Sequence, residues 1–235
     1  MGDFTQGVSE EHGGRSCVVN LKSAGSFFSD ILALLLLPRV KFPTTPGLVL
    51  ALPSVRAVMG SDRDCAFRER SVCTRQGRQL AIREYSFEDF AALVEMYKGF
   101  TPKRVAQGLP PPDVPRIANW LDRLQHKSRS LLAWDGQRVV GQVILCPISD
   151  AAAEYTIFVH QDYRCQGLGT AMTQLALEFA GDMGFAEVLL STELSNYPAM
   201  CLYRKLGFQI LSVYGEECEM KVSVIRPESA LPHAA

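Results

Sequence analysis

The stretch at residues 158–170 carries the strongest chemical signal in the sequence, because a glycine-rich turn joins an apolar strand-like segment to an apolar helix-like one. The first N–H groups of a helix that starts at such a turn have no partner inside the helix. They lie at the positive end of the helix dipole, so they favour an anion such as phosphate. Gly167 and Gly169 carry no side chain that would hold the anion away from the backbone, and Arg164 and Gln166 add hydrogen-bond donors.

Other phosphate motifs fit this turn badly. A dinucleotide fingerprint needs a third glycine where this chain has Met172, and the pattern G-x-x-x-x-G-K-[ST] occurs nowhere in the sequence. Glycine is also the default residue of any tight turn. The glycine pair alone therefore leaves both an anion site and a plain strand-to-helix turn open.

The elements that position this turn follow from the periodicity of the sequence after Gln79. Asp135-Gly136 is a strong hairpin signal, so the strands beside it are expected to be antiparallel. Residues 101–112 form a loop rich in Pro and Gly that is a candidate wall for a substrate site. Strands are predicted at 80–85, 130–134, 138–146, 154–160, 187–192, 208–214 and 218–224, and helices at 86–98, from Asp113 onward, at 168–184 and at 198–206. This order predicts an α/β domain with a mixed sheet and helices on both faces.

Residues 1–76 differ from the regular part of the chain. The apolar run Phe27–Leu37 contains Asp30 and has about 11 residues, whereas a membrane span needs about 20. The first residues are acidic, so the basic start of a secretory signal is missing. We therefore expect a weakly ordered extension of unknown role at 1–76, a folded domain at 77–225 and a disordered tail at 226–235. A second interpretation is that Met59 is the natural start.

The composition favours a globular protein and argues against several partners. The 24 Lys and Arg residues nearly balance the 25 Asp and Glu residues, so no strong field favours nucleic acid or an anionic membrane. The 7 Cys residues are odd in number and scattered without a C-x-x-C pair, which argues against a disulfide framework and a metal site. Reduced thiols predict a cytoplasmic setting.

Two further segments complete a recognisable pattern. The motif R-x-x-G-x-G at 164–169 is followed by Asn-Tyr-Pro-Ala at 196–199 and by Leu-Tyr-Arg-Lys-Leu-Gly-Phe at 202–208. In this order and spacing the segments resemble the GNAT superfamily of acetyl-CoA-dependent N-acetyltransferases, and residues 139–141 with 157–160 resemble bacterial members. The resemblance covers about residues 79–224 and implies the GNAT acyl-CoA N-acyltransferase fold with a mostly antiparallel sheet. Cys165 stands where Gly or Arg is commoner, at a position taken here as unconstrained.

The resemblance implies roles for the matching residues. Phe158 and Val159 would offer backbone groups to the pantetheine arm and the thioester carbonyl. Asn196 would hydrogen-bond the pantetheine, Ala199 would keep the following helix close, and Tyr203 would protonate the departing sulfur. The pyrophosphate would be held by Arg164, Gln166, Gly167, Leu168, Gly169 and Thr170. Acetyl-CoA is then the co-substrate, an amine is the acceptor, and no metal is needed.

Elementary acid–base chemistry adds a candidate base. An alkyl amine has a pKa of about 10.4, so its free base costs about 4.6 kcal/mol at pH 7 and the reaction needs a proton acceptor. Glu154 lies on the strand before the turn, where apolar neighbours would raise its pKa toward a useful value. A phenol such as Tyr203 matches a leaving thiolate, and an N–H near Val159 can stabilise the developing oxyanion.

Each of these roles has a structural alternative. Glu154 is otherwise a solvated strand residue, and Tyr203 a core aromatic. The sequence therefore predicts direct acetyl transfer from acetyl-CoA to a primary amine of a small molecule or protein. The alternative is a catalytically silent module that binds or senses acyl-CoA. The acceptor's identity is not predicted, and a homodimer stays open.

Overall fold

The computed structural model describes residues 65–103 and 110–224. Three of the predictions fall outside the described residues: the tail at 226–235, the start at Met59, and residues 1–64 of the extension. So does part of the predicted loop at 101–112. Within the described ranges, no helix is long and apolar enough to cross a lipid bilayer.

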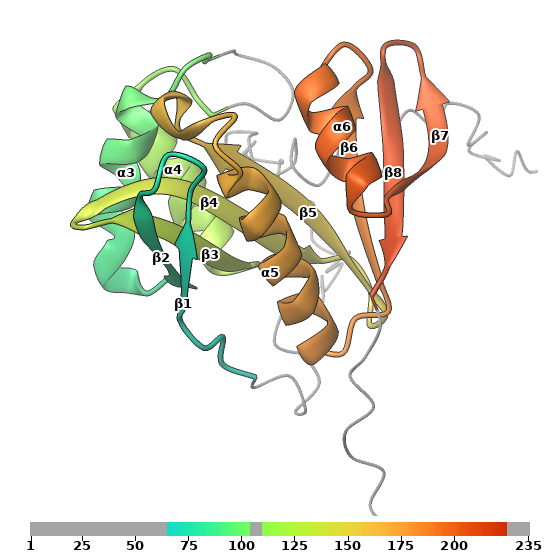
Figure 1. Cartoon of the computed structure of the whole chain (residues 1–235), viewed down its shortest axis with the longest axis horizontal. Coiled ribbons are helices and arrows are strands. Elements are labelled where there is room, and N and C mark those ends of the chain that lie inside the picture. The colour runs from blue at the N-terminus through green and yellow to red at the C-terminus, as the bar shows by residue number, and fades with distance from the viewer. Residues whose placement is uncertain (1–64, 104–109, 225–235) are drawn as a thin grey trace, which may run out of the picture.

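An eight-stranded mixed sheet forms the centre of the domain (Figure 1). Its strand order is β1-β2-β3-β4-β5-β6-β8-β7, and every neighbouring pair is antiparallel except β5 with β6. The mixed, mostly antiparallel sheet expected from the sequence is therefore confirmed. The strands are β1 (Arg70–Cys73), β2 (Gln79–Glu84), β3 (Arg129–Asp135), β4 (Arg138–Pro147), β5 (Ala152–Val159), β6 (Glu187–Glu193), β7 (Gln209–Tyr214) and β8 (Glu217–Ser223).

Strand β1 was not predicted from the sequence. Its four residues are mostly exposed, so they lack the apolar alternation that marks a half-buried strand. A turn at 74–78 folds β1 back onto β2, and Gly77 adopts a positive φ of 80° there. The sheet thus begins inside the segment that was expected to be a loose extension.

Helices cover both faces of the sheet, as predicted (Figure 1). Helices α3 (Phe90–Gly99) and α4 (Val114–Gln125) pack on one face, and α5 (Leu168–Asp182) and α6 (Tyr197–Lys205) belong to the core on the other. The helix expected from Ser86 begins as a 3-10 turn, η1 (Phe87–Asp89), closed by a capping box between Ser86 and Asp89. Asp113 caps α4 by accepting a hydrogen bond from Arg116 N at 3.0 Å.

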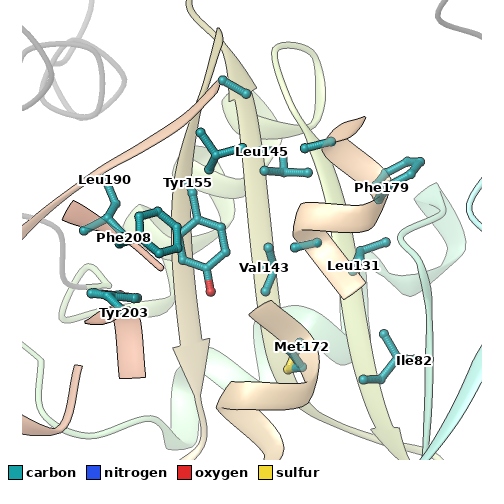
Figure 2. Close-up of a cluster of buried hydrophobic side chains, with 14 of the residues drawn as sticks. Ile82, Leu131, Val143, Leu145, Tyr155, Met172, Phe179, Leu190, Tyr203 and Phe208 are labelled. Atoms are coloured by element: carbon teal, nitrogen blue, oxygen red, sulfur yellow. The ribbon is translucent and has the colours of Figure 1, made fainter. Parts of the chain in front are cut away.

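Two apolar clusters hold these layers together. Trp120 of α4 and Tyr97 of α3 pack edge-to-face at 5.1 Å between ring centroids on one side. On the other side, Met172 and Phe179 of α5 share a larger cluster with Val143 and Tyr155 of the sheet (Figure 2). Because each strand alternates its side chains between the two clusters, the sheet itself fixes which residues of β5 face which layer.

Strands β5 and β6, in the middle of the sheet, pair over only three residues each and then diverge. Parallel β5 and β6 pair only over Ala152–Glu187, Ala153–Val188 and Glu154–Leu189. Beyond Glu154, β5 runs on for five residues to Val159 without a neighbour on that side. The sheet therefore has a wedge-shaped opening next to the start of α5.

Candidate active site

A cavity of about 920 Å³ lies in the opening between β5 and β6. Its walls come from β5, the glycine turn before α5, the end of β6 and helix α6, with additions from the β1–β2 turn and from Phe100 and Pro102 after α3. Pro102 belongs to the loop predicted as a substrate wall. The predicted site residues on its surface are Glu154, Phe158, Val159, Arg164, Gly167, Gly169, Thr170, Asn196, Ala199 and Tyr203.

Gln166 and Leu168 are the predicted site residues that do not line the cavity. Leu168 is 1% exposed and belongs to the large apolar cluster. Gln166 is 7% exposed, and its side-chain amide donates to Asp162 O at 2.6 Å. Only their backbone N–H groups remain as contributions to an anion site.

The glycine turn has the geometry of an anion site. Gly167 caps α5 with a positive φ of 90°, and the first hydrogen bond of the helix runs from Ala171 N to Gly167 O at 3.1 Å. The N–H groups before Ala171 are therefore not used inside the helix. A Cβ at Gly169 would meet Leu202 and Val159, which both line the cavity, so this glycine keeps the cavity open.

Arg164 connects the glycine turn to the end of β5 and to the segment after α3. Its Nε donates to Val159 O at 2.9 Å, a terminal nitrogen donates to Thr101 O, and the guanidinium lies 5.0 Å from the centroid of the Phe100 ring. Burial lowers the pKa of Arg164 from its usual value. Two of its donor groups are used by backbone carbonyls around the cavity, and the residue still lines the cavity, so its phosphate contact stays a prediction.

Cys165 occupies a constrained position, which corrects the sequence interpretation. Its φ of 59° is in the left-handed region, a backbone conformation that is rare for residues other than glycine and asparagine. Because the strain comes from the Cβ, a glycine at this position relieves it.

Cys165→Gly is expected to raise the free energy of unfolding by about 1 kcal/mol, since the left-handed conformation costs about 1–2 kcal/mol for a residue with a Cβ. Urea denaturation of the ligand-free protein measures this. The matched variant Cys201→Gly, at an exposed position inside α6, should lower stability by roughly a few tenths of a kcal/mol. Equal destabilisation by both changes would contradict the assignment.

At the open edge of β5, the backbone groups that face away from β4 have no partner on β6, and one of them, Val159 O, accepts a hydrogen bond from Arg164. His160 N donates to Val140 O at 2.9 Å, so in the antiparallel register Phe158 also turns its N–H and C=O toward β4. Ile157 and Val159 turn theirs toward the opening. The resemblance implies backbone contacts from both Phe158 and Val159 to the coenzyme. In the structure the backbone groups of Val159 and Ile157 face the opening, whereas those of Phe158 face β4.

Glu154 lies where the two strands separate, and it is buried. It is 6% exposed, and burial raises the pKa of its carboxyl to about 7. Its cross-strand neighbour Cys146 donates to Lys127 O just after α4, so Glu154 points to the same face as α3 and α4. The alternative of a solvated carboxylate does not hold.

Tyr203 reaches the cavity from the opposite face. Its ring packs against Tyr155 at 6.2 Å and Phe208 at 5.5 Å in the core below α6 (Figure 2). It is 7% exposed, and burial raises its pKa well above the usual value. Its hydroxyl makes no hydrogen bond to any residue that the structure describes. The ring is thus a core aromatic, as the structural alternative expected, but the residue also lines the cavity.

Comparison with known proteins identifies this arrangement. The model of the acetyltransferase (GNAT) family matches residues 90–208, which is 119 of the 235 residues. The chain belongs to the GNAT family. Human N-acetyltransferase 8 is 34% identical over 79 residues, or 31% of this chain and 35% of that protein. Mouse N-acetyltransferase family 8 member 3 is 36% identical over 90 residues, or 36% of this chain and 40% of that protein.

The GNAT fold is also found in solved structures. The GNAT domain of S. lividans PAT superposes with a TM-score of 0.57 at 16% identity, covering 66% of this chain and 96% of that chain. The matches to the curated N-acetyltransferases span well under half of their length. The family model places this chain in the family, and the structural match shows the fold.

Sequence reasoning missed several residues of this GNAT site. Arg75 reaches the cavity from the β1–β2 turn, Ser191 and Glu193 reach it from β6, and Glu217 from β8. Strand β6 itself was predicted, but its distance from β5 at this point was not. In residues 65–103 and 110–224, no group of three His, Cys, Asp or Glu side chains is arranged to hold a metal.

Proposed function

We propose that this chain is an acetyl-CoA-dependent acetyltransferase that transfers the acetyl group directly to a primary amine. The observation that carries the proposal is the combination found in one cavity: an unpaired strand edge, a glycine turn at a helix start, a buried carboxyl and a phenol. The GNAT match supports it, as does the N-acetyltransferase activity named for the curated relatives.

The coenzyme fits the opening as an added strand. Its pantetheine arm carries amide groups that can pair with Ile157 and with the N–H of Val159, whose C=O accepts from Arg164, much as a peptide extends a sheet edge. Its pyrophosphate suits the N–H groups of the glycine turn. Asn196, the N-cap residue of α6, has no side-chain capping bond and is left to hydrogen-bond the arm.

Proton transfer is assigned to two residues on opposite faces. The cavity includes Phe158 and Glu154 from the α3 and α4 face and Tyr203 from the α5 face, so it passes through the gap in the sheet. An amine that approaches from the first face meets Glu154, which takes its proton directly or through a water. Tyr203 donates its proton to the departing thiolate, and the N–H of Val159 stabilises the carbonyl oxygen.

Binding and turnover test the proposal in two steps. Acetyl-CoA at 100 times its Kd should raise the free energy of unfolding by about 2.7 kcal/mol, whereas NAD or ATP should not. A panel of amino acids, polyamines, aminoglycosides and peptides with Lys or free N-termini should then release CoA with at least one class. Stabilisation without CoA release from any amine would favour the silent acyl-CoA-binding module instead.

The acceptor class, a homodimer and the cytoplasmic setting stay predictions. The amine panel addresses the acceptor, and sedimentation of the full chain addresses the dimer.

A further inference from the structure

Hydrogen bonds join the β1–β2 turn both to the glycine turn and to the short helix that precedes it. Arg75 N donates to Gln166 O at 2.9 Å. Arg78 donates to the Tyr163 hydroxyl at 3.2 Å, and that hydroxyl donates to Asp135 at 2.6 Å. Tyr163 belongs to η2 (Gln161–Tyr163), which leads into the glycine turn. The tip of the hairpin is therefore held in a defined place beside the predicted anion site.

This attachment places the side chain of Arg75 next to the glycine turn. A Cβ built on Gly167 would lie 3.7 Å from Arg75 Cγ and 3.8 Å from its Nε, and Arg75 lines the same cavity. The residue is exposed. Within residues 65–103 and 110–224 its guanidinium makes no ion pair, whereas Arg78 pairs with Asp135 and Arg164 is held by Val159 O.

The cavity surface carries two cations besides Arg75, namely Arg164 of the turn and Lys205 at the end of α6. The helix start contributes about half of a positive charge. Arg164 is braced against backbone carbonyls, and Gln166 is turned away toward Asp162. A diphosphate at this turn would therefore gain from a further cation whose hydrogen-bond donors are not already used by the backbone. Arginine suits this task, because its planar fork can donate two parallel hydrogen bonds to phosphate oxygens.

We propose that Arg75 is a coenzyme-binding residue that pairs with a phosphate group of acetyl-CoA at the glycine turn. The inference rests on the proposed function. It extends the coenzyme site to a hairpin that lies before the region matched by the family model, which begins at residue 90. The hairpin thereby becomes part of the binding site as well as the edge of the sheet.

Titration calorimetry of Arg75→Ala tests this against three ligands: acetyl-CoA, acetyl-dephospho-CoA and acetyl-pantetheine, which lacks all phosphates. The variant should bind acetyl-CoA about tenfold more weakly, in keeping with the loss of one charge-assisted phosphate contact. Its affinity for acetyl-pantetheine should equal that of the unmodified chain. Arg75→Lys, which keeps the charge but not the fork, should recover part of the loss.

Arg70→Ala is the matched control, because it removes an exposed arginine from the same hairpin outside the cavity. It should leave all three affinities unchanged. Weaker binding of both phosphate-bearing ligands by Arg75→Ala supports contact with the diphosphate, and weaker binding of acetyl-CoA alone supports contact with the 3′-phosphate. Equal weakening for acetyl-pantetheine, or no weakening for any ligand, overturns the role of Arg75.

The same measurements separate this inference from the proposed function. If the unmodified chain does not bind acetyl-CoA, the proposed function itself fails. If it binds and Arg75→Ala binds equally well, only the role of Arg75 is lost. A second readout is turnover: kcat at saturating acetyl-CoA should be unchanged in Arg75→Ala, while KM for acetyl-CoA rises about tenfold, as expected for a residue that only binds the phosphate.

Discussion

Tyr203→Phe is expected to lower kcat by a factor on the order of 10²–10⁴, the usual contribution of a positioned general acid. The change removes only the hydroxyl, which has no hydrogen-bond partner among the described residues, and leaves the ring packed against Tyr155 and Phe208. Stability and acetyl-CoA affinity should therefore stay close to those of the unmodified chain. CoA release under saturating acetyl-CoA and amine measures the loss.

A second tyrosine serves as the control. The Tyr97 hydroxyl donates to Gln142 at 2.6 Å in the opposite cluster and does not line the cavity. Tyr97→Phe leaves the buried amide oxygen of Gln142 unpaired, so it should lower the free energy of unfolding by about 1–3 kcal/mol and spare turnover. If Tyr203→Phe kept full turnover, Tyr203 would be a core residue only, and the departing thiolate would need another proton source.

Glu154→Gln is expected to abolish the rise of activity with pH around neutrality. Burial raises the pKa of Glu154 to about 7, and only the ionised carboxylate can accept a proton from the amine. In the unmodified chain kcat should therefore increase through about pH 7 and level off above it. The amide cannot ionise, so the variant should lose this limb, and its rate should fall by a factor on the order of 10²–10⁴.

The same substitution should make the fold more stable at alkaline pH. A carboxyl whose folded pKa is raised binds its proton more tightly in the folded state, so stability falls as pH rises from 4.5, the ordinary pKa of Glu, to about 7. The fall is on the order of 3 kcal/mol. Glu154→Gln removes this dependence, because its amide stays neutral. At pH 8 the variant should therefore be inactive and yet more resistant to urea.

This pairing of lost activity with gained stability distinguishes catalysis from unfolding. Glu95→Gln provides the control, because that carboxylate is 69% exposed on α3 and pairs with Lys98 at the surface. It should change neither the pH profile nor stability by more than a few tenths of a kcal/mol, roughly the value of an exposed pair. A pH limb that persists in Glu154→Gln would transfer the role of base to another group.

Much of the fold was accessible from local patterns. The helix predicted from Asp113 onward is α4, and its apolar side chains, Trp120 and Leu124 among them, are buried in the structure. The Asp135-Gly136 turn joins two antiparallel strands as predicted, with Gly136 at a positive φ of 58°. These features depend on residues close together in the chain, so hydrophobic period and turn chemistry are enough to predict them.

The sequence could indicate a residue of the candidate site only where residue type or motif points to a role. The glycine turn, Glu154 and Tyr203 were predicted to belong to one site, and all of them line one cavity, while their roles in catalysis and binding stay predictions. Which backbone groups of β5 face the opening depends on its register with β4, and the contacts of Arg164 depend on the segment after α3. Neither is encoded in spacing along the sequence.

The sequence by itself determined the order of helices and strands from residue 79 onward and the glycine turn, and it supplied a candidate acid–base pair in Glu154 and Tyr203. Tertiary structure alone decided that β1 joins the sheet, that Arg75 lies beside Gly167, and that Cys165 is held in a left-handed conformation. The physical reason is that these features arise from contacts between segments distant in the chain. Their energy comes from hydrogen bonds and packing that no local pattern of residues records.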